Sequence, residues 1–209
     1  MWPFPKNQQS EAKEQREYYL HAKDYIDENE IDVLASKIRW TLQHSFEKEI
    51  IFLCIGSDRS TGDSLGPLVG TMLKEKQIPY HVYGTLEEPI HALNLEKVLK
   101  QIHKLHRDPL IFGIDACLGN EQQIGYVFFK EEPFIPGNAL NKMLPPVGDL
   151  HLAAVVNDLN PLSPIQSLID TRLYIVINLA KTITNIITRA VADDKIIIKD
   201  ECSSEGLSL

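Results

Sequence analysis

Two segments of this chain join an apolar run to an aspartate, and together they constrain the fold more than any other feature. Residues 49–69 read EIIFLCIGSDRSTGDSLGPLV, which is an apolar run, a Gly/Ser/Asp loop and the start of a helix. Residues 110–120 repeat the plan as LIFGIDACLGN. Apolar residues at consecutive positions are typical of parallel strands buried on both faces. The carboxyl ends of parallel strands lie at one edge of the sheet, where ligands bind. We therefore expect Asp63 and Asp115 to lie together at that edge.

Strands and helices alternate along most of the chain. We expect strands at residues 50–55, 80–86, 110–116, 122–130, 151–157 and 173–177, and helices at residues 64–75, 95–106, 161–169 and 180–192. Asp63 and Asn94 are predicted to cap the first two helices, since short polar side chains accept hydrogen bonds from a helix start. The strand at 122–130 is compatible with an antiparallel pairing. This alternation predicts a three-layer α/β/α sandwich with a mostly parallel central sheet.

The chain divides into three parts by composition. Residues 1–48 are expected to form an N-terminal helical extension, because apolar residues recur at helical spacing from Ile31 onward. Residues 49–195 hold the alternating pattern and are predicted to form the α/β/α domain. Residues 196–209 are predicted to be a C-terminal tail.

Composition narrows the classes of function. The net charge of -8 argues against a general nucleic-acid binder, which needs a basic face. The sequence has neither an apolar run of the roughly 20 residues of a membrane span nor a signal-peptide core. Its three cysteines, Cys54, Cys117 and Cys202, show no metal-binding spacing and indicate reduced thiols. We therefore expect a cytoplasmic protein that binds no nucleic acid or membrane, with a homo-oligomer remaining possible.

Polar side chains are predicted to gather around the two aspartates, at loops that leave the strands. The candidates for substrate binding are Ser57, Asp58, Arg59, Ser60, Glu88, His91 and His151. Converging carboxylates suit hydrolytic acid/base chemistry or a metal site. Simpler alternatives stay open, because Asp63 can serve as a helix cap, Arg59 can pair with Asp58, and a lone histidine is often structural.

Two nucleotide-binding motifs are excluded by the loop after the first strand. Five residues separate Gly56 from Gly62, and Asp63 follows, whereas a P-loop has four residues and then Gly-Lys-Ser/Thr. An aspartate in place of that lysine would repel a phosphate. No GxGxxG follows a predicted strand, so a Rossmann dinucleotide site is excluded too.

Cys117 offers a third chemistry. It lies two residues after Asp115, so it is a candidate thiol nucleophile with His151 or His91 as its base. A cysteine in an α/β core is more often a small apolar filler.

The segments IGSDRSTGDSLGPLVG and FGIDACLGN together resemble the superfamily of germination proteases and hydrogenase-maturation proteases. Within it, residues 50–192, including YGTLEEPIHALNLE and VGDLHLAAVVN, are similar to sporulation proteins of the YyaC type from spore-forming Bacilli. The resemblance implies a hydrogenase-maturation-protease-like fold. It also implies that Asp63 and Asp115 match the pair regarded as catalytic in the germination protease. In hydrogenase-maturation peptidases, matching carboxylates hold a metal with a downstream histidine, for which His151 is the candidate. A divalent metal on Asp63, Asp115 and His151 is therefore an expectation.

These observations lead to two hypotheses. The first is a peptidase-like hydrolase of the sporulating cell or spore interior, in which Asp63 and Asp115 share a proton and cleave a protein or peptide substrate. The second is a non-catalytic protein on the same fold that binds a peptide, protein or metal during sporulation. The superfamily resemblance does not decide between them, since a fold does not fix a function.

Overall fold

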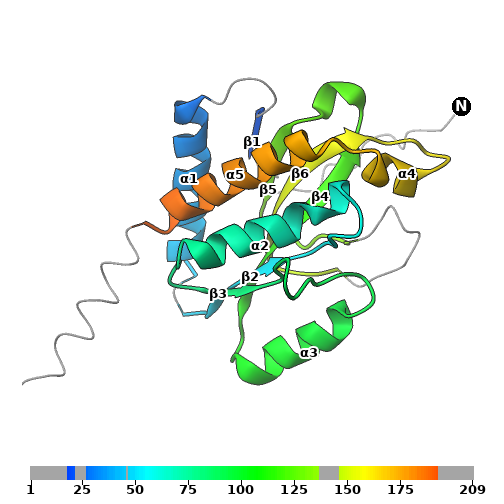
Figure 1. Ribbon diagram of the computed structural model, residues 1–209. Coiled ribbons are helices and arrows are strands. Elements are labelled where there is room, and N and C mark those ends of the chain that lie inside the picture. Colours follow the sequence, from blue (N-terminus) through cyan, green and yellow to red (C-terminus); the bar gives the residue numbers. More distant parts are fainter. Residues whose placement is uncertain (1–17, 22–26, 46, 137–145, 193–209) are drawn as a thin grey trace, which may run out of the picture.

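A six-stranded sheet forms the centre of the computed structural model, which describes residues 18–21, 27–45, 47–136 and 146–192 (Figure 1). In spatial order, its strands are β1 (Tyr18–His21), β5 (Tyr126–Lys130), β6 (Leu150–Asp158), β4 (Leu110–Gly119), β2 (Ile50–Cys54) and β3 (His81–Tyr83). The last four are parallel, β5 is antiparallel to β6, and β1 is antiparallel to β5. The predicted mostly parallel sheet and the antiparallel option for β5 are confirmed.

Helices cover both faces of this sheet. The helices are α1 (Glu28–Gln43), α2 (Leu65–Glu75), α3 (Leu95–Leu105), α4 (Pro164–Ile169) and α5 (Leu173–Ala190). In Figure 1, α1, α2 and α5 lie on one side of the sheet and α3 lies on the other. This arrangement is the predicted three-layer α/β/α sandwich. None of the described helices is both long and apolar enough to cross a bilayer.

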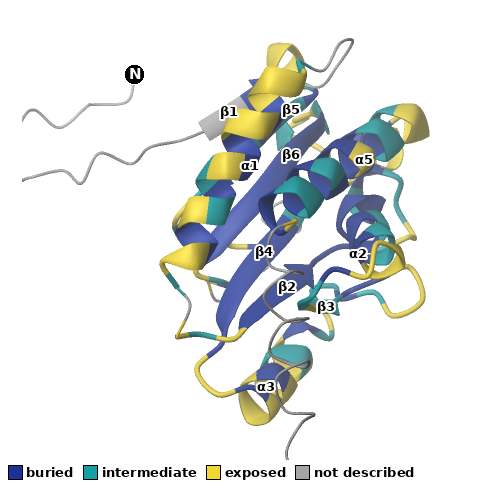
Figure 2. Ribbon diagram, turned by 90° about the vertical axis from the view of Figure 1, so that its left-hand side faces the viewer, coloured by how far each residue is buried: buried dark blue, intermediate teal, exposed yellow. Residues whose placement is uncertain are grey.

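The strands are apolar at consecutive positions because each face of the sheet has its own core. Phe52 and Phe112 pack toward α1, α2 and α5, whereas Ile51 and Leu53 pack toward α3. Figure 2 shows the central strands β2 and β6 mostly buried, while α1 and α3 each have an exposed side. Burial of both faces stabilises the central strands through the hydrophobic effect and fixes their register.

The start of α5 corrects one sequence prediction. Residues 173–177 read LYIVI, which predicts a strand, yet they form the first turns of α5. Val176, Ala180 and Ile183 are buried at helical spacing, and neither Gly nor Pro interrupts the segment. Packing of a continuous helical face against the sheet therefore outweighs the local β-propensity of this run.

The start of α2 corrects another. Asp63 lies in a 3₁₀ turn (Gly62–Ser64), and the N-cap of α2 is Ser64, without a capping hydrogen bond from its side chain. Asp63 is therefore not the predicted side-chain cap. Asn94 is the N-cap residue of α3, as expected, but its Oδ1 accepts from the backbone N–H of His91 instead of from the helix.

The predicted N-terminal extension contributes a helix and a strand. Helix α1 confirms the helical spacing, and β1, which the sequence did not predict, adds to the sheet beside β5. The Arg39 guanidinium donates hydrogen bonds to the carbonyls of Arg189 and Ala190, which ties α1 to the end of α5. The boundary between residues 48 and 49 stays a prediction, and the predicted tail lies outside the described residues.

Candidate active site

Asp63 reaches the carboxyl end of the sheet through a tight return of the loop after β2. The backbone N–H of Ser57 donates to the carbonyl of Asp63 at 3.0 Å, which closes the loop. Gly56 permits this approach, because a Cβ there would lie 2.0 Å from that carbonyl oxygen and its φ is +146°. The Gly56 N–H also donates to the carbonyl of Ile90 at 2.7 Å, so the loop after β3 lies alongside. Two backbone contacts thus position Asp63 beside the segment that carries His91.

Asp115 comes from the middle of the sheet, on β4. It pairs with Ala153 of the parallel strand β6, and the ladder between β4 and the parallel strand β2 reaches the preceding residue, Ile114. The Asp115 Oδ1 accepts from the N–H of Ala116 at 2.8 Å. Because Asp115 is opposite Ala153 on β6, it shares a face with His151, two residues earlier on that strand.

One cavity of about 540 Å³ joins the two aspartates. Its polar lining comes from Asp63, Asp115, Ser60, Cys117 and His151, and its apolar lining comes from Ala116, Leu118, Phe128, Phe134, Ile135, Ala153, Leu159, Pro161, Pro164, Ile165 and Leu168. Two carboxyl groups in the lining of a mostly apolar cavity form a site suited to acid/base chemistry on a bound ligand.

Phe134 forms one wall of this cavity by lying on β4. A Cβ at position 113 would lie 2.0 Å from the Phe134 ring, so the absence of a side chain at Gly113 leaves room for the ring. The Phe134 ring also contacts the His151 ring, with centroids 5.3 Å apart. A second part of the lining comes from α4 and the residues before it, where Ile165 is 51% exposed. The cavity therefore has a fixed aromatic wall and a partly exposed aliphatic one.

The pKa values of the two aspartates are both raised. Burial raises the pKa of Asp63 to about 6, which the nearby His91 and a backbone hydrogen bond from Ser57 partly offset. Burial also raises the pKa of Asp115 well above its ordinary value, and the charge of Asp63 raises it further. Asp63 therefore ionises first and Asp115 keeps its proton to higher pH. One carboxylate next to one carboxylic acid is the arrangement that acid/base hydrolysis uses.

Comparison with known proteins assigns the chain to a family. A model described as "Protein of unknown function (DUF1256)" matches residues 22–186. The chain belongs to the DUF1256 family. It is also 40% identical over 173 residues to "Uncharacterized protein YyaC" of Bacillus subtilis (strain 168), and the match covers 82% of each chain. These findings confirm the predicted similarity to YyaC-type proteins.

A solved structure similar to this DUF1256 chain is a [NiFe] hydrogenase maturation protease, HycI, from Thermococcus kodakarensis KOD1. The TM-score is 0.45 at 18% sequence identity, and the match covers 71% of this chain and 99% of that chain.

His151 and Ser60 are the sequence candidates that line the cavity with the two aspartates. The His151 Nδ1 lies 2.8 Å from the carbonyl of Glu132 and donates to it, which makes Nε2 the acceptor atom of the ring. Within the described part of the chain, Ser60 Oγ is the buried side-chain polar atom without a hydrogen-bond partner. Such an atom is suited to a hydrogen bond with a bound ligand.

Other sequence candidates lie at the margin of the site. His91 acts on the pKa of Asp63, but it lines a neighbouring groove together with Glu88. Asp58 and Arg59 are exposed, and the Ser57 Oγ accepts from the backbone N–H of Arg59. A substrate role for these five residues stays a prediction.

Cys117 lines the cavity as a protonated thiol. Burial and the charge of Asp115 raise the pKa of Cys117 to about 12. A thiol needs a lowered pKa to act as a nucleophile at neutral pH, so this environment disfavours the thiol-hydrolase alternative.

The donor types of Asp63, Asp115 and His151 suit a divalent metal, but their geometry does not gather them as a ligand set. In the portion of the chain that the structure describes, three potential ligand atoms come within 4.8 Å of one another at Glu49, His81 and His106. Asp63, Asp115 and His151 do not form such a group, so no catalytic step is assigned to a metal there.

Sequence reasoning did not find the walls of the cavity. Phe134 and Ile135 come from a segment rich in Pro and Gly, and Leu159 and Ile165 lie near α4. The available signal was Gly113 in a central strand, because a glycine there indicates close approach by another group. The exposed apolar residues around α4 give no such signal without the fold.

Proposed function

We propose that this protein is an aspartate-dependent, peptidase-like hydrolase that cleaves a peptide bond in a protein substrate. The observation that carries the proposal is the convergence of Asp63 and Asp115 in one cavity with mostly apolar walls. Like-charged carboxyl groups that share a buried site favour a state with one proton between them. Such a pair can activate water and protonate a leaving group without a further cofactor.

The two aspartates take different roles in this mechanism. Asp63 is less buried and lies near His91, so it is the carboxylate that takes a proton from the attacking water. Asp115 holds its proton and donates it to the leaving amine. The rate should rise as the pH passes about 6, where Asp63 ionises, and fall at higher pH, where Asp115 loses its proton.

The walls of the cavity indicate the substrate class. Phe134 and Ile165 suit an apolar side chain of a peptide, and Ser60 Oγ suits a polar group of its backbone. Helix α2 begins two residues after Asp63, and the N–H groups at its start are the candidate donors to the tetrahedral oxyanion. Following the family resemblance, we place this activity in the cytoplasm of a sporulating cell.

A binding protein without catalysis is the second candidate, and the surface around α4 favours it. Leu162 is 96% exposed, Ile165 is 51% exposed and Ile169 is 48% exposed. Exposed apolar residues beside a cavity are typical of a docking site for a peptide or protein. Such a site can bind a segment of a partner while the two aspartates only shape its polar end.

Digestion of a mixture of unfolded proteins and peptides, read by mass spectrometry, tests the proposal. New termini should appear with the wild type and disappear with Asp63→Asn and Asp115→Asn. Glu75→Gln is the matched control, because it makes the same change of carboxylate to amide at an exposed residue of α2. Equal cleavage by wild type and both aspartate variants would exclude the pair as the catalytic groups. Absence of cleavage, together with retention of a peptide on the wild type, would favour the binding protein.

A further inference from the structure

Three polar side chains from separate elements meet at the opposite end of the sheet from the two aspartates. Glu49 immediately precedes β2, His81 begins β3, and His106 is the C-cap residue of α3. The register of the sheet brings them together, since Ile51 on β2 is opposite His81 on β3. The carbonyl of Glu49 also accepts from the N–H of Leu110 at 2.9 Å, which fixes its backbone beside β4.

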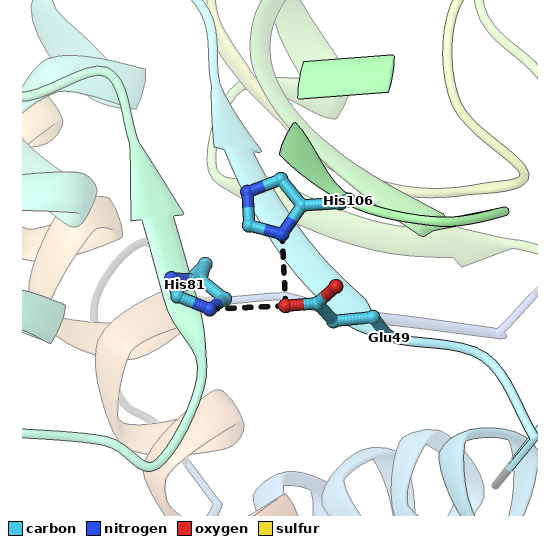
Figure 3. Close-up of side chains that lie close together, drawn as sticks. All are labelled: Glu49, His81 and His106. Carbon is cyan, nitrogen blue, oxygen red and sulfur yellow. Dashed lines mark ion pairs between the residues drawn. The ribbon is translucent and has the colours of Figure 1, made fainter. Parts of the chain in front are cut away.

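The ligand atoms of these residues face one another (Figure 3). Glu49 Oε1 lies 3.1 Å from His81 Nε2 and 2.8 Å from His106 Nδ1. All three atoms lie within 4.8 Å of one another. The two imidazole rings approach with their centroids 4.6 Å apart. Each residue thus offers a nitrogen or oxygen atom to a common point.

Tyr83 orients the ring of His106 through a hydrogen bond. Its hydroxyl lies 2.8 Å from His106 Nε2, on the side of the ring away from Glu49. When Nδ1 is the ligand atom, Nε2 carries the proton and donates it to the Tyr83 oxygen. Histidines that bind metals ordinarily hold their second nitrogen in such a hydrogen bond, which fixes the tautomer and the ring orientation.

We propose that Glu49, His81 and His106 form a binding site for a divalent transition-metal cation of the zinc type. Two imidazole nitrogens and one carboxylate oxygen are a donor set that Zn²⁺ binds at about 2.0–2.2 Å. A tetrahedral ion at those distances separates its ligand atoms by roughly 3.4 Å. The observed separations of 3.1 and 2.8 Å need to open by a few tenths of an ångström, which side-chain rotation allows.

The exposure of the cluster indicates which kind of site it is. The side chain of His106 is 7% exposed, whereas those of Glu49 and His81 are 41% and 57% exposed. The buried histidine anchors the ion, and the fourth coordination position opens to solvent. Three protein ligands with an open position are typical of zinc sites that bind a water or an exogenous ligand, in contrast to closed structural sites.

Equilibrium dialysis of the full-length protein against Zn²⁺, with metal counted per chain, tests this site. We expect the wild type to bind one Zn²⁺ per chain. His81→Gln should lower the affinity for Zn²⁺ by roughly 100-fold, because even the loss of an outer hydrogen-bond partner weakens metal binding about 10- to 100-fold. Tyr83→Phe should lower the affinity for Zn²⁺ by about 10-fold and still allow one ion per chain at saturation. Co²⁺ in place of Zn²⁺ should give the visible absorption of a four-coordinate ion, and His81→Gln should remove it.

Two control variants separate this site from other metal-binding groups. His103→Gln removes an exposed histidine of α3 that lies outside the cluster, and it should leave binding unchanged. Asp115→Asn removes a carboxyl group from the cavity at the other end of the sheet and should also leave the ion in place. Zinc binding that His81→Gln does not alter, or that Asp115→Asn removes, would overturn the proposal. Failure of the wild type to bind zinc would also overturn it and would leave the cluster as an ion pair between Glu49 and the two histidines.

Discussion

The two ends of the sheet gather titratable groups in opposite ways. At the carboxyl end, Asp63 and Asp115 are carboxyl groups of the same kind, enclosed in a mostly apolar cavity. At the amino end, the partly exposed Glu49 lies between the exposed His81 and the buried His106. The first arrangement raises the pKa values of both aspartates and disfavours the state in which both are ionised. The second brings complementary groups together, and it costs little because water still reaches them.

The contrast shows that the unfavourable electrostatic interaction between like groups lies at the carboxyl end of the sheet. The ladders on both sides of β4 and the loop contact between Ser57 and Asp63 hold the two aspartates together despite their repulsion. Sites of this kind reduce stability and are retained where they serve chemistry. The amino end needs no such restraint, since the Glu49 carboxylate lies within hydrogen-bond distance of both imidazole rings.

Asp63→Asn has the largest expected effect. Loss of the general base should lower the rate of peptide cleavage by about 10²- to 10⁴-fold while the protein stays folded. Initial rates on a peptide identified as a substrate, with circular dichroism as a check of folding, measure both quantities. Glu75→Gln should retain the wild-type rate, and full activity of Asp63→Asn would remove this residue from the mechanism.

Gly113→Ala should disturb the aromatic wall at the carboxyl end. The new Cβ meets the Phe134 ring at 2.0 Å, so we expect a loss of about 1–3 kcal/mol in the free energy of unfolding. Urea unfolding measures this loss. The same substitution in a Phe134→Ala background should cost much less, because the ring is gone. An equal cost in both backgrounds would show that Phe134 does not lie on Gly113.

Asp115→Asn should stabilise the protein at high pH. A raised pKa in the folded state means that unfolding releases a proton, so wild-type stability falls as the pH rises above the ordinary aspartate value of 3.8. Asparagine removes this dependence and still accepts from the Ala116 N–H. The variant should therefore melt above the wild type at pH 8, by about 2–4 °C per kcal/mol, with a smaller difference at pH 5. Equal melting temperatures at pH 8 would contradict a raised pKa.

Glu49→Gln should have the smallest effect and the opposite sign. In metal-free protein it replaces the carboxylate that both His81 and His106 contact, and the exposed setting limits the expected loss to about 1 kcal/mol. Urea unfolding in the presence of a chelator measures it. Stabilisation by Glu49→Gln would show that the two ends of the sheet do not differ as described.

The sequence predicts the central part of the fold and the convergence of the two aspartates. Apolar runs such as Ile50–Cys54 mark parallel strands, and parallel strands deliver their following residues to one edge, which is why Asp63 and Asp115 could be placed together. The strand Tyr18–His21 was not predicted, because four residues at an edge carry little pattern. Residues 173–177 were assigned wrongly, because a run of four β-branched and aromatic residues after Leu173 does not reveal the helix that continues beyond it.

The rest of both sites depends on contacts between distant segments. His106 lies 57 residues from Glu49, and the two meet only through the sheet register and the end of α3. The apolar lining that includes Phe134 and Ile165 likewise depends on the positions of loops, which the hydrophobic pattern of the sequence does not predict. Local patterns predict elements and their directions, whereas the ligand atoms at a site are brought together by tertiary packing.

The most direct test of the coupling between Asp63 and Asp115 is an NMR titration of the Asp115 carboxyl carbon in wild type and in Asp63→Asn. We expect a wild-type pKa well above 3.8, because Asp115 is buried beside the charge of Asp63. Asp63→Asn should lower this pKa, since one cause of the shift is removed, and Glu75→Gln should leave it unchanged. An Asp115 pKa near 3.8 in the wild type, or one that Asp63→Asn does not lower, would contradict the coupled pair on which the proposed function rests.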